Sequence, residues 1–180
     1  MASGPLRAVI LNGSVGSGKT STAHQVGAAL ATAGVSGAVV DLDHLGAGWP
    51  SPPEDPFRLA VTLDNLAAVA QVYARHGMTS LVLAGVVESA EHRERHRDAL
   101  GVSPTLIRLT APVEVLQARV ATRSSTDSER DWHVARAPEL AAILDRADID
   151  DHAVSTHDRP PDAVVSEILT LLDWEPDHHR

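Results

Sequence analysis

Eight consecutive residues near the start of the chain have the types and spacing needed to hold a phosphate group. They fit the pattern G-x-x-x-x-G-K-[ST], and Ser21 follows them: Gly13, Ser14, Val15, Gly16, Ser17, Gly18, Lys19 and Thr20. The glycines let the backbone bend around a phosphate, and the loop N–H groups then form a nest for an anion. Lys19 is expected to reach the β- and γ-phosphates of ATP, and the Thr20 hydroxyl to hold Mg²⁺. Residues 13–21 are therefore predicted to bind the nucleotide.

A pair of acids, Asp41 and Asp43, ends the second expected strand. Positions i and i+2 of a strand face the same way, so both carboxylates should project together into a ligand crevice. One of them can hold Mg²⁺, and the other can orient a substrate hydroxyl and accept its proton. Asp41 is the first choice for the base, and Asp43 for orienting substrate or metal. A pair of solvated acids in a turn is the alternative, but no acid directly follows the apolar run at residues 81–83 to take over these duties.

Arginines gather in the second half of the chain. Arg119 and Arg123 are i and i+4 on a helix expected to begin at Pro112. Arg130 lies in the polar segment after it, and Arg136 begins the next expected helix. A closing segment that carries arginine can neutralise the charge that develops on transferring phosphates. We therefore expect a lid at about residues 122–132, with Arg123 acting in catalysis. An exposed helix end with cations near its C-terminal dipole is the alternative.

Strands and helices are expected to alternate along the chain. The expected strands cover residues 8–11, 37–43, 79–84, 105–109 and 153–156. The expected helices run from about 19 to 33, 55 to 75, 89 to 100, from 112, from 133 to 146 and from about 158. This alternation predicts an α/β fold with a parallel sheet and helices on both faces. Ligands bind beyond the carboxyl ends of such strands, where the phosphate-binding loop and the acid pair lie.

Composition limits the class of protein. The chain has 180 residues, 43% of them hydrophobic and 22% charged, which suits one domain spanning residues 1–180. A net charge of −9 makes nucleic acid an unlikely partner, and no apolar run is long enough to span a membrane. The absence of cysteine and of a signal peptide fits a cytoplasmic protein. The ten histidines are expected at the surface, including His92 and His96, with His44 as the exception to watch because it adjoins Asp43. Trp49 either lines a substrate pocket or covers the core.

Together these features resemble the small P-loop kinases related to nucleoside-monophosphate kinases. Within that group the chain is similar to shikimate, gluconate and adenylylsulfate kinases and to chloramphenicol phosphotransferase. The resemblance implies a three-layer P-loop NTPase fold, with a five-stranded parallel sheet in the order 2-3-1-4-5 and a small lid. It also implies ATP and Mg²⁺ as donor, Arg119 near the adenine or ribose, and Arg123 and Arg130 on phosphates. The chain departs from the shikimate kinases after the third strand, where only Gly85 stands in place of a Gly-rich turn.

The expected activity is ATP-dependent transfer of a γ-phosphoryl group to a hydroxyl of a small molecule, by a monomer or a homodimer. The segment at about residues 44–58 is expected to select the acceptor. A nucleoside or nucleotide kinase is an alternative, with Arg58 or Arg93 holding an acceptor phosphate. An ATP-binding regulatory module that turns over little is another.

Overall fold

Five parallel strands form the centre of the computed structural model, which describes residues 6–122 and 126–174. The strands are β1 (Arg7–Asn12), β2 (Gly37–Asp41), β3 (Ser80–Ala84), β4 (Thr105–Thr110) and β5 (His152–Ser155). Their order across the sheet is β2-β3-β1-β4-β5, so the expected topology is confirmed. Val9 in β1 is paired with Val82 on one side and with Thr105 on the other. The carboxyl ends of the strands therefore meet at one edge.

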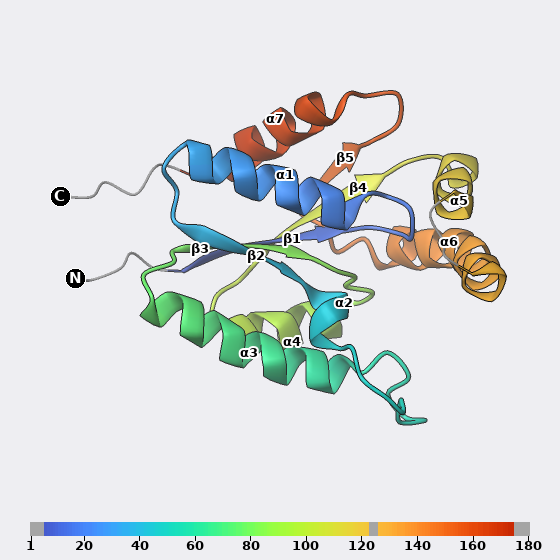
Figure 1. The fold of residues 1–180 in the computed structure, drawn as a ribbon, viewed down its shortest axis with the longest axis horizontal. Helices are drawn as coiled ribbons and strands as arrows, with labels where there is room; N and C mark the ends of the chain where they lie inside the picture. The colour runs from blue at the N-terminus through green and yellow to red at the C-terminus, as the bar shows by residue number, and fades with distance from the viewer. Residues whose placement is uncertain (1–5, 123–125, 175–180) are drawn as a thin grey trace.

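Helices cover both faces of the sheet (Figure 1). Helices α1 (Lys19–Thr32) and α7 (Pro161–Leu172) pack on one face, and α3 (Leu59–Arg75) and α4 (Ala90–Leu100) on the other. The short α2 (Leu42–Leu45) directly follows β2. Helices α5 (Val113–Ala121) and α6 (Asp127–Ala147) lie together beyond the carboxyl edge of the sheet. This arrangement leaves the strand ends enclosed by α2, α5, α6 and the loops between them.

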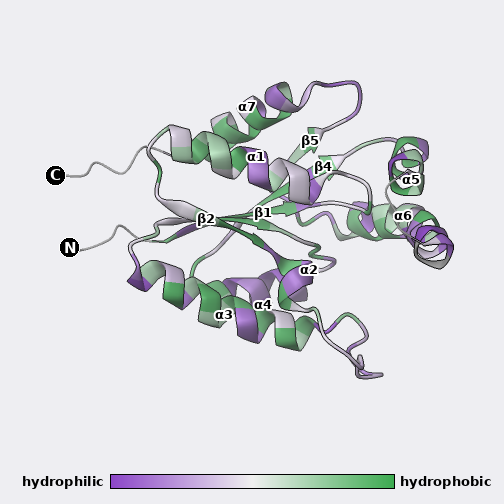
Figure 2. Cartoon of the chain, viewed as in Figure 1, coloured by the Kyte–Doolittle hydropathy of each residue, from purple (hydrophilic) through white to green (hydrophobic). Residues whose placement is uncertain are grey.

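The core consists of two apolar layers, one on each side of the sheet. Val9 and Leu11 of β1 pack toward α1 and α7, whereas Ile10 packs toward α3 and α4. All three side chains are fully buried. Figure 2 shows apolar residues along β1 and hydrophilic residues over much of α4. A strand that is covered on both faces reads as a continuous apolar run, which explains why the central strands were recognisable in the sequence.

Helix α3 begins later than expected. The sequence predicted that it starts at Asp55 and Pro56, but the helix starts at Leu59. Asp55 still caps it, because its carboxylate accepts hydrogen bonds from the N–H groups of Leu59 at 2.8 Å and Ala60 at 2.9 Å. The chain makes an extra turn before the helix, with Arg58 in a left-handed conformation at a φ of 51°. Arg58, and not Asp55, therefore occupies the N-cap position, although Asp55 supplies the side chain that accepts the N–H groups of the first turn.

Helix α6 begins at Asp127, six residues before the expected start at residue 133. The residues of its first turns are polar, so they give no apolar periodicity. A helix surface can instead be supported by ion pairs three or four residues apart, and Asp127 and Arg130 form such a pair at 2.8 Å. Residues 127–132 of the predicted lid are thus helical. Residues 123–125 of the predicted lid lie outside the described residues.

Candidate functional site

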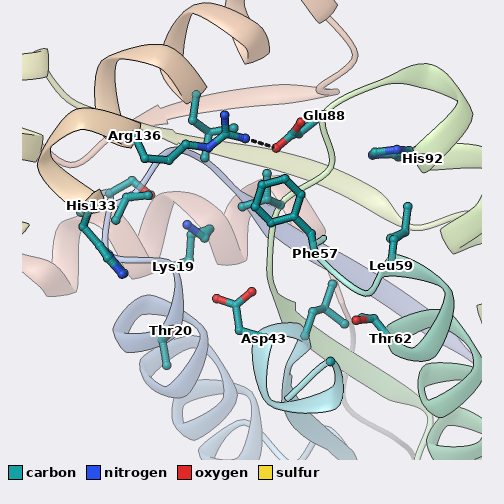
Figure 3. Close-up of a pocket in the computed structure, with 18 of the residues that line it drawn as sticks. Lys19, Thr20, Asp43, Phe57, Leu59, Thr62, Glu88, His92, His133 and Arg136 are labelled. Carbon is teal, nitrogen blue, oxygen red and sulfur yellow. Dashed lines mark hydrogen bonds and ion pairs between the residues drawn. The ribbon is translucent and has the colours of Figure 1, made fainter. Parts of the chain in front are cut away.

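A cavity of about 1270 Å³ opens at the carboxyl edge of the sheet. The phosphate-binding loop forms one wall, and the segment before α3, with α4, forms another. Helices α5 and α6 contribute Arg119, Trp132, His133 and Arg136. Figure 3 shows Lys19, Asp43, Phe57 and Arg136 around the same space. The cavity lies where the parallel sheet was expected to bind its ligand.

The phosphate-binding loop has the backbone that its glycines were expected to give. Gly16 and Gly18 adopt left-handed conformations, with φ of 83° and 94°, and α1 starts at Lys19. The Lys19 Nζ donates hydrogen bonds to the carbonyls of Gly13 at 2.9 Å and Ser14 at 3.1 Å. The ammonium group is therefore held over the loop at the positive end of the α1 dipole, where an anion is favoured.

The predicted nucleotide-binding residues do not all face the cavity. Residues 15–21 line it, whereas Gly13 and Ser14 do not. Ser14 is buried, and its hydroxyl donates a 2.6 Å hydrogen bond to the carbonyl of Ala137 in α6. The Gly13 N–H donates to the Asn12 Oδ1 at 2.9 Å. These two residues do not line the cavity, and their carbonyls accept the hydrogen bonds from Lys19.

Gly16 is a position of the loop where a side chain is poorly tolerated. A Cβ added there would lie 2.6 Å from the carbonyl oxygen of Leu116 in α5, and the φ of 83° disfavours any L side chain. Strain and overpacking together should lower the free energy of unfolding of Gly16→Ala by about 2–4 kcal/mol. Urea denaturation measures this loss. Gly48→Ala is the matched control, because nothing lies within 4 Å of its Cβ, and equal stability of the two variants would contradict the close contact with α5.

Asp41 and Asp43 do not project side by side from a strand, so this prediction is wrong. Strand β2 ends at Asp41, and Asp43 lies in the first turn of α2. Asp41 caps this helix, because its Oδ1 accepts a hydrogen bond from the Asp43 N–H at 3.0 Å. The two carboxylates therefore belong to different elements, and each has a different environment.

Asp41 faces the start of α1, and Asp43 faces the cavity. The Thr20 hydroxyl donates to the Asp41 Oδ2 at 2.8 Å, whereas Asp43 is exposed and lines the cavity with Lys19 (Figure 3). Thr20 and Asp41 place a hydroxyl and a carboxylate oxygen together beside the phosphate-binding loop. This donor set fits Mg²⁺, which is bound through few protein oxygens together with water and phosphates.

Of the arginines expected at the nucleotide, Arg119 lines the cavity and Arg130 does not. Arg119 lines the cavity, and its guanidinium donates to the Oγ1 of Thr156 at 2.9 Å and to the Thr156 carbonyl at 2.8 Å. It also reaches the carbonyl of Gly16 at 3.4 Å. Arg130 does not line the cavity and is paired with Asp127. Arg123 lies outside the described residues, so its predicted contact with phosphate and its predicted catalytic part stay predictions.

Arg136, the last of the arginines that the sequence grouped around the expected lid, lines the cavity. Its Nη2 forms a 2.7 Å ion pair with Glu88, and its guanidinium lies 5.4 Å from the centroid of the Phe57 ring. Glu88 does not cap the neighbouring α4, because the Ser89 hydroxyl caps that helix by accepting from the His92 N–H at 3.1 Å. The three residues come from α6, from the loop after β3 and from the segment before α3. Only the fold brings them together, since no local pattern links positions 57, 88 and 136.

The segment expected to select the acceptor contributes much of one cavity wall, including Gly46, Ala47 and Phe57. Trp49 is an exception. Its side chain is 92% exposed and does not line the cavity, so neither interpretation of this residue was correct. Of the arginines considered for an acceptor phosphate, Arg58 lines the cavity and donates to the Gly46 carbonyl at 3.0 Å. Arg93 does not line it and binds Asp151 and the Ile149 carbonyl.

Asn12 links the two sides of the site. Its side chain is fully buried, and its Oδ1 accepts from the N–H groups of Gly13 at 2.9 Å and Val87 at 3.1 Å. Its Nδ2 donates to the Val87 carbonyl at 3.1 Å and to the Asp150 Oδ1 at 2.8 Å. Burial raises the pKa of the Asp150 carboxyl, and the bond from Asn12 opposes that rise. A polar residue at the end of an apolar strand was the only signal for this network in the sequence.

His96 is not at the surface, contrary to expectation. It is 1% exposed and lines the cavity from α4, and its Nδ1 lies 2.7 Å from the carbonyl of His92. Most of α4 is charged, so the burial of His96 was hidden in a polar sequence. Burial lowers the pKa of His96, and the hydrogen bond with the His92 carbonyl opposes that effect.

The lowered pKa of His96 predicts a loss of stability in acid. Below the ordinary histidine pKa of about 6.5, the imidazole binds a proton in the unfolded chain but resists it in the folded chain. The free energy of unfolding therefore decreases as the pH is lowered. His96→Gln should reduce the slope of this fall between pH 6.5 and 5.5 by up to about 1.4 kcal/mol per pH unit. Urea unfolding at each pH gives the slope. His24→Gln, an exposed histidine of α1, is the control, and equal slopes in the two variants would contradict the assignment.

Two further observations concern the described ranges as a whole. Within residues 6–122 and 126–174, no helix has the length and apolar character required to cross a membrane. The same part of the chain contains no group of three or more His, Asp or Glu side chains placed to hold a metal ion. A site made of Thr20, Asp41 and nucleotide phosphates does not need such a group.

Comparison with known proteins places the chain in a family. Residues 9–146 match the sequence profile of a family described as an AAA domain, and the chain belongs to this family of P-loop proteins. No curated protein matches the chain. Solved structures share its fold, among them the APS kinase of Mycobacterium tuberculosis in complex with AMPPNP and APS. That structure has a TM-score of 0.63 and 24% identity, over 95% of this chain and 100% of that one.

Two other solved structures with this fold are also small-molecule kinases. A gluconokinase from Sinorhizobium meliloti has a TM-score of 0.60 and 20% identity, over 94% of this chain and 92% of that one. A shikimate kinase from Acinetobacter baumannii in complex with shikimate has a TM-score of 0.57 and 18% identity, over 92% of each chain. At these identities the likeness concerns the fold, and it agrees with the P-loop and the sheet order already described.

Proposed function

We propose that the protein is an ATP-dependent kinase that transfers the γ-phosphoryl group to a hydroxyl of a small molecule. The observation that carries this proposal is the position of Asp43, whose carboxylate lines the same cavity as Lys19 and the phosphate-binding loop. A phosphoryl donor held by the loop and a group that can accept the proton of an alcohol then share one space. Catalysis of this type depends on positioning and electrostatic stabilisation.

On the donor side, the loop amides and Lys19 hold the β- and γ-phosphates of ATP. Arg119, fixed by Thr156, lies at the end of the loop next to Gly16, where the ribose and adenine extend. Thr20 and Asp41 hold Mg²⁺. When bound, this ion neutralises charge on the phosphates that are being separated.

On the acceptor side, Asp43 accepts the hydroxyl proton as the alcohol oxygen attacks the γ-phosphorus. A new P–O bond forms to the acceptor, the bond between the γ-phosphorus and the ADP oxygen breaks, and the electron pair leaves with ADP. Asp43 then gives its proton to solvent. This assignment reverses the initial preference for Asp41 as the base, because Asp41 is already bonded to Thr20 and to the N–H of Asp43.

A screen for acceptor-dependent ADP release tests the proposal. The panel should contain adenylylsulfate, gluconate and shikimate, which are the substrates that the kinases of the same fold suggest. It should also contain nucleosides, nucleoside monophosphates and hydroxyl-bearing antibiotics. We expect at least one class of alcohol to stimulate ADP release. Tight ATP binding without stimulation by any acceptor would instead support the regulatory module.

A further inference from the structure

Asn12 uses every hydrogen-bonding position of its side chain. An amide group has an oxygen with two lone pairs and a nitrogen with two hydrogens. In Asn12 the oxygen accepts from the N–H groups of Gly13 and Val87, and the nitrogen donates to the Val87 carbonyl and to Asp150. The side chain is fully buried, where each polar atom left unpaired would be costly. The position therefore demands two acceptor and two donor sites on a short side chain, which Asn provides.

Asn12 lies where the pairing between β1 and β3 ends. The last paired residues are Leu11 and Ala84, and the Gly85 N–H donates to the Leu11 carbonyl at 3.3 Å. After them, the Asn12 side chain binds both the N–H and the carbonyl of Val87, each at 3.1 Å, as a neighbouring strand would. The segment that follows β3 is therefore fixed to the end of β1 by a side chain.

Val87 lies between two residues of the cavity wall. Val86 and Glu88 line the cavity, whereas Val87 is fully buried and does not line it. Because Asn12 holds both backbone groups of Val87, it also sets where Glu88 begins. Glu88 in turn holds Arg136 through the 2.7 Å ion pair drawn in Figure 3.

The phosphate-binding loop reaches the same ion pair by a second route. The Ser14 hydroxyl donates to the Ala137 carbonyl at 2.6 Å, and Ala137 directly follows Arg136 in α6. Both Ser14 and Ala137 are buried. The contacts thus close a ring, whose links are Asn12 with Val87, Glu88 with Arg136, and Ala137 with Ser14. A displacement of the loop is therefore passed to the ion pair from two sides.

We propose that Asn12 is a positioning residue that passes the binding of nucleotide at the phosphate-binding loop to the Glu88–Arg136 pair in the cavity wall. Its Oδ1, which the N–H groups of Gly13 and Val87 share, is the point of transfer. The catalytic consequence rests on the proposed kinase function, in which this pair, next to Phe57, borders the space for the acceptor. The transfer itself is measured with a nucleotide analogue and no acceptor.

The experiment follows backbone amide signals by NMR while AMPPNP and Mg²⁺ are added to saturation. The Val87 amide is the reporter, because Val87 is buried outside the cavity wall and its N–H is bonded to Asn12. The variants are Asn12→Ala and a double variant, Asn12→Asp with Asp150→Asn, which keeps an oxygen at position 12 without facing two carboxylates. Ile168→Val is the control for lost stability, because Ile168 is fully buried in the apolar layer under α7. Thermal unfolding shows which variants are folded.

In the wild type, AMPPNP should shift the amide signals of Gly13 and Val87 together, because both groups donate to one oxygen. Asn12→Ala should keep the Gly13 shift and lose most of the Val87 shift, whereas the double variant and Ile168→Val should keep both. A Val87 shift that survives in Asn12→Ala, or that is absent from the wild type, would overturn the proposal. Its loss in the double variant or in Ile168→Val would do so as well, and the double variant decides the matter if Asn12→Ala does not fold.

The rate of ADP release with ATP and the acceptor panel separates this proposal from the proposed function. Asn12→Ala should lower kcat by about 10- to 100-fold, as a misplacement of about 1 Å can, and leave the Kd for ATP close to that of the wild type. The double variant should recover part of the rate. An Asn12-dependent Val87 shift without ADP release for any acceptor would support the positioning role and contradict the kinase. Release that Asn12→Ala leaves unchanged would support the kinase and overturn the positioning role, and a wild type that does not bind AMPPNP would overturn both.

Discussion

Replacing Asp43 with Asn should lower kcat by about 10²- to 10⁴-fold, the usual contribution of a general base. The amide keeps the size of the carboxylate but cannot take the hydroxyl proton. Asp43 is exposed and caps no helix, so the variant should remain folded. Its Kd for ATP should stay close to that of the wild type. Single-turnover kinetics with an acceptor found in the screen, together with ATP titration, measure both quantities.

Asp41→Asn is the matched comparison for this variant, because it removes one carboxylate two residues away. Asp41 bonds to the Thr20 hydroxyl, so its loss should weaken the binding of Mg²⁺ and raise the concentration of Mg²⁺ that gives half-maximal rate. At saturating Mg²⁺ the chemical step should recover in Asp41→Asn and not in Asp43→Asn. The opposite pattern would restore Asp41 as the base.

Replacing Lys19 with Ala should abolish measurable turnover, with a loss of at least about 10³-fold in kcat/KM. One charged donor on a transferring phosphoryl group contributes about 10²- to 10³-fold in kcat, and the same ammonium also holds ATP before the reaction. The fold should persist, because Lys19 belongs to neither of the two apolar layers that form the core. Initial rates of ADP release and a calorimetric titration with ATP measure the effect.

Arg75→Ala is the control for the loss of positive charge, since Arg75 is an exposed cation at the end of α3 and does not line the cavity. It should retain wild-type rates. A Lys19→Ala variant that is folded and turns over at more than about a tenth of the wild-type rate would mean that this loop does not hold the transferred phosphate.

The fold and the donor side were predictable because their signals are local. Glycines at positions 16 and 18 specify left-handed backbone, and Lys19 then falls at the first position of α1. The apolar runs of β1 and β3 indicated buried parallel strands, and their order followed from a resemblance to proteins with the same loop. In each case a short stretch of sequence determines the feature, and distant residues only pack against it.

The acceptor side was less predictable because it is assembled from distant segments. Phe57, Glu88 and Arg136 meet only in three dimensions, and His96 is a buried residue of a largely charged helix. The error at Asp43 has a different cause. A side chain that caps the next helix ends a strand early, so the period-two rule stopped applying at Asp41. Competition between a strand and a capped helix start cannot be resolved from two acids alone.

The most direct test of the account follows the γ-phosphoryl group itself. Phosphorus NMR of a reaction with ATP, Mg²⁺ and an acceptor from the screen distinguishes ADP, inorganic phosphate and a phosphate ester. The account predicts one phosphate ester for each ADP formed, and no ester with Asp43→Asn over the same time. ADP accompanied only by inorganic phosphate, or ester formation that is unchanged in Asp43→Asn, would contradict it.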